Sequence, residues 1–301
     1  MKNGILFLET LSPLHAGSET SLGLVDKPIQ REKVTEFPVI FGSSLKGALR
    51  EFFEKTELNE NKKLNENKKK FFDLFGPEDE NSESYASAIS ITDARILLFP
   101  VASIKGVYAY ITCPFVINRF ISEAKLLNIK NLPSKEIDIK INDNEIYVCK
   151  GNTHLVINNN VVLTEFQFSS KYSDALDEIF NYLSNNAEVL KEKICILSDD
   201  NFKYFVKFNT EVMARVKIGD DGVTDIKKGG NLWYEENIPI YSKFYSIITC
   251  FQSRNVSENR TKTDELDKYF NELFKGLNSF VIGGNKTIGK GIVKSKFLGG
   301  E

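Results

Sequence analysis

The chain has 301 residues and a formal net charge of -2, and 42% of its residues are hydrophobic and 27% charged. These values are ordinary for a soluble globular protein, and the length suffices for one large domain or for one domain with large insertions. The near-neutral charge excludes a molecule that attracts nucleic acid through its overall field, so any site for a polyanion must be a local patch.

The spacing of apolar residues predicts a succession of short strands and helices. In residues 42–56, for example, apolar side chains recur at helical spacing, and Ser43 or Ser44 can cap this helix. The order of the elements favours an α+β fold with a ferredoxin-like sheet that carries insertions. In the first half of the chain we predict a strand at 4–11, a helix at 42–56, strands at 88–101 and 106–115, and a helix at 115–128. A helix at 172–193, a strand passing into a helix over 194–206 and a hairpin over 209–239 that turns at Asp221-Gly222 follow. The chain then closes with a strand at 243–251, a helix at 263–280, and a strand, Gly-rich loop and strand over 280–298.

Two segments have the composition of insertions. The unit LNENKK is repeated in tandem from residue 58, and an acidic stretch follows it, so we expect a flexible insertion over 56–86. Residues 130–170 alternate weakly and contain Asn-rich turns, which favours a β-rich insertion. Neither segment divides the chain, and we expect 1–301 to form a single domain.

The cysteines do not indicate a metal site, and the N-terminal segment does not indicate a signal peptide. The four cysteines lie far apart without metal-ligand spacing, so we expect buried, reduced thiols at Cys113, Cys149, Cys195 and Cys250. The N-terminus lacks the pattern of a signal peptide, and no apolar stretch approaches about 18 residues. We therefore expect a cytoplasmic protein with no membrane partner.

The C-terminal loop GGNKTIGKG is similar to a phosphate-binding loop. Residues 284–291 nearly match the pattern GxxxxGK[ST], but Gly291 replaces the hydroxyl residue that would hold Mg²⁺, and a strand pattern follows instead of a helix. This argues against a nucleotide hydrolase. Glycines that allow close backbone approach, together with Lys286 and Lys290, fit a loop that contacts phosphate; a plain β-turn with solvated lysines is the open alternative.

The stretch GSSLKGALR is a second candidate for an anion site. A helix N-terminus with serine hydroxyls attracts anions, and Lys46 and Arg50 lie four residues apart on one helical face. These two cations repel each other unless an anion lies between them. The alternative is a pair of solvated basic residues beside the helix start.

Four further residues are candidates for acid-base chemistry. His15 is one of only two histidines, Asp26 is an acid in a loop, and Glu235 and Glu236 follow an aromatic pair. Each has a plain alternative, as a structural histidine or as a surface acid. The local sequence contains no Ser/His/Asp arrangement and no metal-ligand spacing that would decide the matter.

Together, these stretches resemble the RAMP proteins of CRISPR systems. SPLHAGSETSLGLVDKPIQRE and VIFGSSLKGALREFF are similar to the N-terminal signature of that family. LFGPE, ITDARILLFPV, YITCP, LWYEENIP and GGNKTIGKG then occur in the order expected of the backbone subunit of the type III-B, or Cmr, complex. The resemblance covers nearly the whole chain. Phe41 stands where a proline is common before Gly-Ser-Ser, which makes the start of the helix less rigid.

The resemblance implies an RRM-like core with a projecting β-hairpin, the thumb. It implies that several copies stack head to tail along a CRISPR RNA with other Cmr-type subunits, and that the assembled complex is an endoribonuclease cutting guide-complementary target RNA at regular intervals. The expected chemistry is attack by the target's 2′-hydroxyl, with a divalent metal, Mg or Mn, whose ligands are unknown. Asp26 is the carboxylate expected to be required for cutting, as a base or as a metal ligand, with His15 and Glu235 or Glu236 near the cut. The expected RNA-binding residues are Ser43, Ser44, Lys46, Arg50, Gly283, Gly284, Lys286, Thr287, Gly289 and Lys290.

Two other interpretations are open at this stage. The chain can be a catalytically inert RNA-binding backbone subunit, in which Asp26 does no chemistry. It can also be the related subunit of type III-A complexes. The stretch HAGSETSLGLVDKPIQRE favours the Cmr type.

Overall fold

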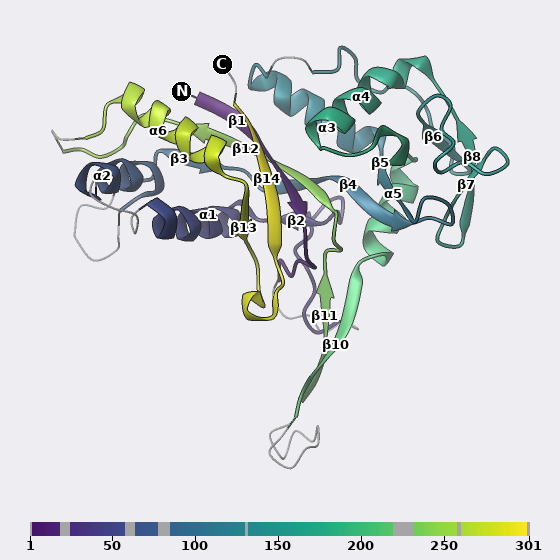
Figure 1. The fold of residues 1–301 in the computed structure, drawn as a ribbon, viewed down its shortest axis with the longest axis horizontal. Coiled ribbons are helices and arrows are strands. Elements are labelled where there is room, and N and C mark those ends of the chain that lie inside the picture. Colours follow the sequence, from purple (N-terminus) through teal and green to yellow (C-terminus); the bar gives the residue numbers. More distant parts are fainter. Residues whose placement is uncertain are drawn as a thin grey trace.

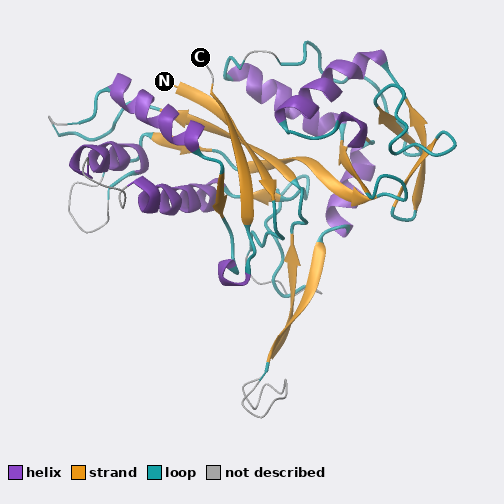
Figure 2. Ribbon diagram, viewed as in Figure 1, coloured by secondary structure: helices purple, strands orange, loops and turns teal. Residues whose placement is uncertain are grey.

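The computed structural model describes residues 2–18, 25–57, 64–77, 85–129, 132–218, 231–257 and 260–299. Within these residues, twelve strands form one mixed sheet and two more form a separate ribbon (Figures 1 and 2). The α-helices are α1 (Gly42–Glu57), α2 (Leu64–Phe75), α3 (Pro114–Leu126), α4 (Asp177–Asn186), α5 (Asp199–Phe208) and α6 (Thr263–Gly276). The strands are β1 (Lys2–Thr10), β2 (Val39–Ile40), β3 (Ile89–Ile91), β4 (Ala94–Ala102), β5 (Tyr108–Thr112), β6 (Glu145–Val148), β7 (Asn160–Leu163), β8 (Phe166–Lys171), β9 (Ile194–Ile196), β10 (Glu211–Lys217), β11 (Asn231–Asn237), β12 (Lys243–Cys250), β13 (Ser279–Val281) and β14 (Ile292–Gly299).

The centre of the sheet has the ferredoxin-like arrangement. Strand β1 lies between β14 and β12, β12 lies beside β4, and all three pairs are antiparallel. In chain order the core therefore runs β1, α1, β4, β12, α6, β14, which is the βαββαβ pattern of this fold. The predicted α+β class is confirmed. The elements from β5 to β11 are inserted between the second and third core strands.

Helices cover both faces of the core sheet. Leu6 lies opposite Phe297 on β14, and the Phe297 ring packs 5.6 Å from Phe270 of α6. Successive strand residues point to opposite faces, and Phe7 accordingly packs on the other side, 6.0 Å from Phe120 of α3. Each face of the core sheet therefore has a helix packed on it.

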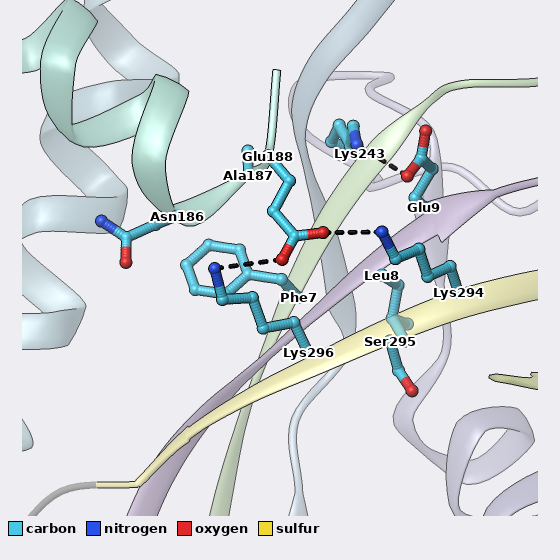
Figure 3. A pocket seen from close by; sticks show the side chains of 10 residues that line it. All are labelled: Phe7, Leu8, Glu9, Asn186, Ala187, Glu188, Lys243, Lys294, Ser295 and Lys296. Atoms are coloured by element: carbon cyan, nitrogen blue, oxygen red, sulfur yellow. Dashed lines mark hydrogen bonds and ion pairs between the residues drawn. The ribbon is translucent and has the colours of Figure 1, made fainter. Parts of the chain in front are cut away.

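The inserted elements widen the sheet and are fastened back to its core. Beyond β4 the sheet continues through β5, β9, β6, β8 and β7 (Figure 1). Figure 3 shows Glu188, which follows α4, between two lysines of β14. Its carboxylate lies 2.7 Å from Lys294 and 3.3 Å from Lys296, and these hydrogen bonds hold the pKa of Glu188 below its usual range. These lysines are therefore occupied in joining the insertion to the core.

The segment expected to be a flexible insertion at 56–86 contains regular structure. Helix α1 continues to Glu57, and α2 occupies the second half of the tandem repeat. Phe71, Leu74 and Phe75, which follow the repeat, are buried, and the Phe75 ring lies 6.0 Å from Phe53 of α1. The helix forms because this apolar face has a partner to pack against. Residues 58–63 and 78–84 lie outside the described part of the chain. Residues 130–170 contain β6, β7 and the start of β8, with irregular backbone over 132–144.

Helix α1 begins before the predicted cap, since a cap at Ser43 or Ser44 implies a first helical residue at 44 or 45. Since the helix starts at Gly42, Ser43 lies inside its first turn, and the Gly42 N–H is satisfied by the Asp93 carboxylate at 2.7 Å.

The N–H of Phe41 donates to the buried Gln30 side chain at 2.7 Å. A proline at position 41 has no N–H to donate, so Phe41 supplies a bond that the common family residue does not make.

Strands β10 and β11 form a ribbon that projects from the body of the molecule (Figure 1). This ribbon is the thumb, and its turn, including Asp221-Gly222, falls outside the described residues. The four cysteines are buried and free. No described helix is both long and apolar enough to pass through a bilayer.

Candidate functional site

The base of the thumb is held by a loop that runs along one edge of β11. Lys27 forms a parallel bridge with Glu235, and its N–H donates to the Tyr234 carbonyl at 3.1 Å. Just before it, the carboxylate of Asp26 accepts the Tyr234 N–H at 2.7 Å. The side chain of Asp26 is exposed. The strand edge therefore fixes an ionisable group at the surface where the thumb leaves the body.

His15 is fixed on the same strand. Its Nδ1 lies 2.7 Å from the carbonyl oxygen of Glu236 and must donate, because a carbonyl oxygen only accepts. In the neutral ring Nε2 is then the acceptor. A Cβ at Gly17 would lie 2.7 Å from Nε2, so glycine at this position leaves room beside the ring. His15 thus presents one nitrogen for proton transfer while the other holds the ring in place.

Asp26 and His15 share one edge of β11. Residues 234 and 236 are two apart, and their backbone groups point to the same side of an extended strand. Tyr234 N anchors Asp26 and Glu236 O anchors His15, and residues two apart are spaced by about 7 Å along a strand at the usual rise. Both side chains are therefore held by the same stretch of one strand edge.

Glu236 is enclosed by partners and ties three segments together. Its Oε1 accepts from Arg31 at 2.6 Å and from Thr210 at 2.7 Å, and its Oε2 accepts the Ile29 N–H at 3.0 Å. Arg31 also donates to the carbonyl of Val206 in α5 at 3.1 Å. Glu236 therefore joins the loop of Asp26 to the element before the thumb. In this arrangement it is a positioning residue rather than a base.

Glu235 points to the other face of β11 and is also paired. Its carboxylate accepts from Lys290 at 2.7 Å and from Asn285 at 2.8 Å, and its side chain is 2% exposed. Burial alone raises the pKa of Glu235, but the hydrogen bonds from Lys290 and Asn285 prevail and lower it. Lys290 itself is buried and also donates to Asn237 at 2.9 Å. Lys290, a predicted RNA contact, is thus engaged in an internal ion pair in this structure.

The start of the Gly-rich loop packs on the His15 segment. The Gly284 N–H donates to the His15 carbonyl at 2.9 Å, and the Gly291 N–H donates to Pro13 at 3.0 Å. Gly283 has φ +86°, and a Cβ there would lie 2.6 Å from the His15 carbonyl oxygen. These glycines bring the loop against the site through close backbone contact. They do not leave those two amides free for phosphate.

The tip of the same loop is exposed. Lys286, Thr287 and Gly289 are exposed, and Lys286 pairs with Glu51 of α1 at 2.6 Å. Hydrogen bonds from Lys286 and Lys55 lower the pKa of Glu51 to about 2. Because this pair lies in solvent, Lys286 can exchange Glu51 for a phosphate at small cost.

The predicted helix site is a separate groove of about 460 Å³ beside the start of α1. Ser43 and Lys46 line it together with Ser87 and Arg254, whereas Ser44 lies near Gln30 at 3.5 Å. Burial, and then the charge of Arg50, lowers the pKa of Lys46, which donates to the Ser87 hydroxyl. This fits the expected repulsion between the two cations.

Arg50 has an internal role. Its guanidinium donates to the carbonyl oxygens of Phe75 at 3.4 Å and Pro77 at 3.2 Å, at the end of α2. Arg50 therefore fastens α2 to α1, and its contact with RNA stays a prediction. Sequence reasoning had also missed Gln30, Arg31, Thr210 and Asn285, of which Gln30 and Arg31 lie in the quoted stretch VDKPIQRE.

The ion pair of Glu236 gives a first prediction. Glu236→Gln is expected to lower the free energy of unfolding by about 2 kcal/mol, because hydrogen bonds to charged groups contribute about 1.5–3 kcal/mol. Urea denaturation of the single variants and of Arg31→Gln/Glu236→Gln measures the coupling. We expect the double variant to lose less than the sum of the single variants, because both remove the same contact. Strictly additive losses would contradict the proposed pairing.

Comparison with known proteins agrees with this architecture. The RAMP superfamily model matches residues 7–294. The Pyrococcus furiosus protein named CRISPR system Cmr endoribonuclease Cmr4 is 38% identical over 303 residues, covering 98% of this chain and 95% of the relative. The Saccharolobus solfataricus protein named CRISPR system CMR subunit Cmr4 is 27% identical over 97% of this chain and 95% of its own length.

A solved structure shows the same similarity in three dimensions. The crystal structure of oligomeric Cmr4 from Pyrococcus furiosus matches with a TM-score of 0.74 at 33% identity, covering 99% of both chains. The predicted resemblance to the Cmr branch of the family is confirmed. Since the family model spans nearly the whole chain and a full-length relative is 38% identical, this chain belongs to the RAMP superfamily and, within it, to the Cmr4 proteins of CRISPR systems.

Proposed function

We propose that this chain is the RNA-binding backbone subunit of a type III-B effector complex and an endoribonuclease that cleaves guide-complementary target RNA. The observation that carries the proposal is that the exposed Asp26 and His15 are anchored on the same edge of β11, at the base of a projecting thumb. The relative at 38% identity is itself named an endoribonuclease. The partners are CRISPR RNA, target RNA, further copies of this chain and other Cmr-type subunits, and the complex acts in the cytoplasm.

The chemistry follows from two fixed groups and a nucleophile that RNA brings with it. The target's 2′-hydroxyl attacks its own adjacent phosphate when the nucleotide is splayed out of the duplex. Asp26 accepts the hydroxyl proton as general base, and His15, protonated at Nε2, gives a proton to the departing 5′-oxygen. The products are a 2′,3′-cyclic phosphate and a 5′-hydroxyl. The positioning residues Glu236 and Arg31 keep the Asp26 loop against β11.

A divalent-ion site made by the protein alone does not fit the residues around Asp26. Among the described residues, no group of three or more His, Cys, Asp or Glu side chains converges as metal ligands. Glu235 and Glu236 are occupied by internal partners, which leaves Asp26 as the accessible carboxylate among the described residues of this site. We propose that Mg²⁺ or Mn²⁺, where required, takes its other ligands from RNA phosphates and water.

The function is tested with the complex purified together with its native partners and guide RNA. A labelled target complementary to the guide is added in single-turnover amounts, and the products are resolved by length. The proposal predicts cuts at regular intervals, one for each backbone copy. Tight target binding without any cut would instead support the inert structural subunit.

The groove beside α1 gives a prediction about guide binding. Lys46→Ala is expected to weaken binding to guide RNA of any sequence, because a phosphate contact positions the chain without reading bases. The slope of log affinity against log salt should become shallower by about 0.7 for the lost phosphate contact. Filter binding over a salt series measures it, with Lys55→Ala at the far end of α1 as matched control. An unchanged slope in Lys46→Ala would show that Lys46 is only solvated.

A further inference from the structure

Three lysines gather on one face of the core sheet, beside the end of α4. In the register of the strands, Glu9 of β1 lies opposite Lys243 of β12 on one side and opposite Lys294 of β14 on the other. Lys296 is two residues beyond Lys294 on β14, so its side chain lies on the same face. Residues directly opposite each other in a sheet have Cβ atoms about 5 Å apart, so strand pairing itself brings these cations together. Figure 3 shows the three lysines around a small cavity.

Lys243 is the buried member of this cluster. Its side chain is 5% exposed, and its ammonium lies 2.9 Å from the carboxylate of Glu9, its one ion-pair partner within the described part of the chain. An ammonium group has three N–H donors, so this contact does not use all of them. Burial lowers the pKa of Lys243, and the hydrogen bond to Glu9 opposes that effect. A further anion beside Lys243 would therefore stabilise its charged form.

Glu188 covers the cavity with an anion that can be displaced. Its carboxylate lies 2.7 Å from Lys294 and 3.3 Å from Lys296, and the three side chains are between 34% and 48% exposed. Ion pairs with this exposure contribute little to stability, so they separate at small cost. The backbone of Glu188 also has φ +53°, a left-handed conformation that residues other than glycine seldom adopt. The lysines are held by strands, whereas the acid between two of them lies in the connection after α4.

The size and charge of the cavity indicate the ligand that it would take. Its volume is about 20 Å³, room for little more than a water molecule, so a larger anion enters only where the Glu188 carboxylate now lies. With Glu188 displaced, three ammonium groups and the Glu9 carboxylate leave two positive charges. A free phosphate group carries a charge of about −1.5 to −2 near pH 7, which balances them. The phosphodiester of an RNA backbone carries one charge and is substituted on two oxygens, so it fits less well.

We propose that this cavity binds free phosphate, which replaces the Glu188 carboxylate and is held by Lys243, Lys294 and Lys296. This site lies on the face of the core sheet and is separate from the residues that act on RNA. Phosphate and the internal carboxylate compete for the same lysines. Since Glu188 fastens the end of α4 to β14, phosphate binding also releases this end of the insertion from the core.

Titration of the full-length chain with inorganic phosphate tests this competition. Isothermal titration calorimetry at constant ionic strength measures the affinity. Glu188→Gln keeps the size of the side chain and removes the competing charge, so we expect phosphate to bind about 10-fold more tightly, the equivalent of two exposed ion pairs. A structural role alone would give no gain in affinity.

Glu36→Gln is the matched control. Glu36 also lies between two lysines, 3.2 Å from Lys203 and 3.0 Å from Lys207, and it also has a left-handed backbone, with φ 63°. Both of these lysines are more than 40% exposed, so this cluster lacks a buried cation like Lys243. We expect the affinity for phosphate to be unchanged in this variant.

Removal of a cation should have the opposite effect. Lys294→Gln is expected to weaken phosphate binding about 10-fold, whereas Lys203→Gln in the control cluster leaves it unchanged. Both lysines are exposed, so the fold should tolerate either substitution, and far-UV circular dichroism checks this. An unchanged affinity in Glu188→Gln, an equal gain in Glu36→Gln, or no phosphate binding even by Glu188→Gln would overturn the proposal.

Discussion

Asp26→Asn is expected to leave target binding intact and to slow target cleavage by at least about 10²-fold, the usual contribution of a positioned acid or base. Asparagine keeps the size of the side chain and an oxygen that can accept the Tyr234 N–H, which in the present structure is 2.7 Å from Asp26. The loop should therefore stay on β11, and what is removed is the negative charge and the proton acceptor.

The experiment compares binding and single-turnover cleavage on the same preparation. Asp200→Asn is the matched control, since Asp200 is an exposed carboxylate at the start of α5 and has no place in the site. The control complex should cut at the normal rate. If Asp26→Asn also cuts at a near-normal rate, Asp26 has no role in the chemistry.

Lys290→Met is expected to lower the free energy of unfolding at pH 7 by about 3–5 kcal/mol, as when one partner of a buried ion pair is removed. Lys290 and Glu235 are 8% and 2% exposed in their side chains and lie 2.7 Å apart. The variant leaves the Glu235 carboxylate buried without its cation. The control Lys286→Met breaks an exposed pair and should cost less than about 0.5 kcal/mol, because solvent screens it.

The pH dependence of the two proteins distinguishes this cause from simple loss of packing. In the unmodified chain the pKa of Glu235 is lowered, so its stabilisation is present above its unfolded value of 4.5 and is lost as pH falls through the lower folded value. Without Lys290, the hydrogen bond that lowers the pKa of Glu235 is lost, and burial, which disfavours the charged carboxylate, then raises this pKa. The cost of the variant should then shrink as pH falls and Glu235 becomes protonated. Urea denaturation at several pH values measures this, and a pH-independent cost would contradict the account.

Sequence patterns predicted the elements better than their contacts. Helical spacing of apolar residues located α1 and α6, and the order of strands indicated the ferredoxin-like core. Helix α2 was missed because its first half is a polar repeat, and its helix depends on burying Phe71 and Phe75 against other elements. The first residue of α1 is set by Asp93, which lies 51 residues away, and no local pattern contains that information.

The same limit applies to the site. Family resemblance drew attention to Asp26 and His15, and the structure brings both to one edge of β11. The resemblance could not distinguish an accessible acid from an enclosed one. The partner that occupies Glu236 lies 205 residues away in the sequence, and the partner of Glu235 lies 55 residues away. The spacing of residues in the sequence does not predict ion pairs between residues so far apart. The bonds of Arg50 to the backbone at the end of α2 could not be predicted for the same reason.

The central claim is that the site on the edge of β11 directs the target's own 2′-hydroxyl at the adjacent phosphate. The most direct test is a target RNA with a single 2′-deoxy nucleotide on the 5′ side of one mapped cut, incubated with the complex in single-turnover conditions. We predict that this one cut disappears while the cuts on either side keep their rates, because only the modified position lacks its nucleophile. Unchanged cleavage at the 2′-deoxy position would contradict the account.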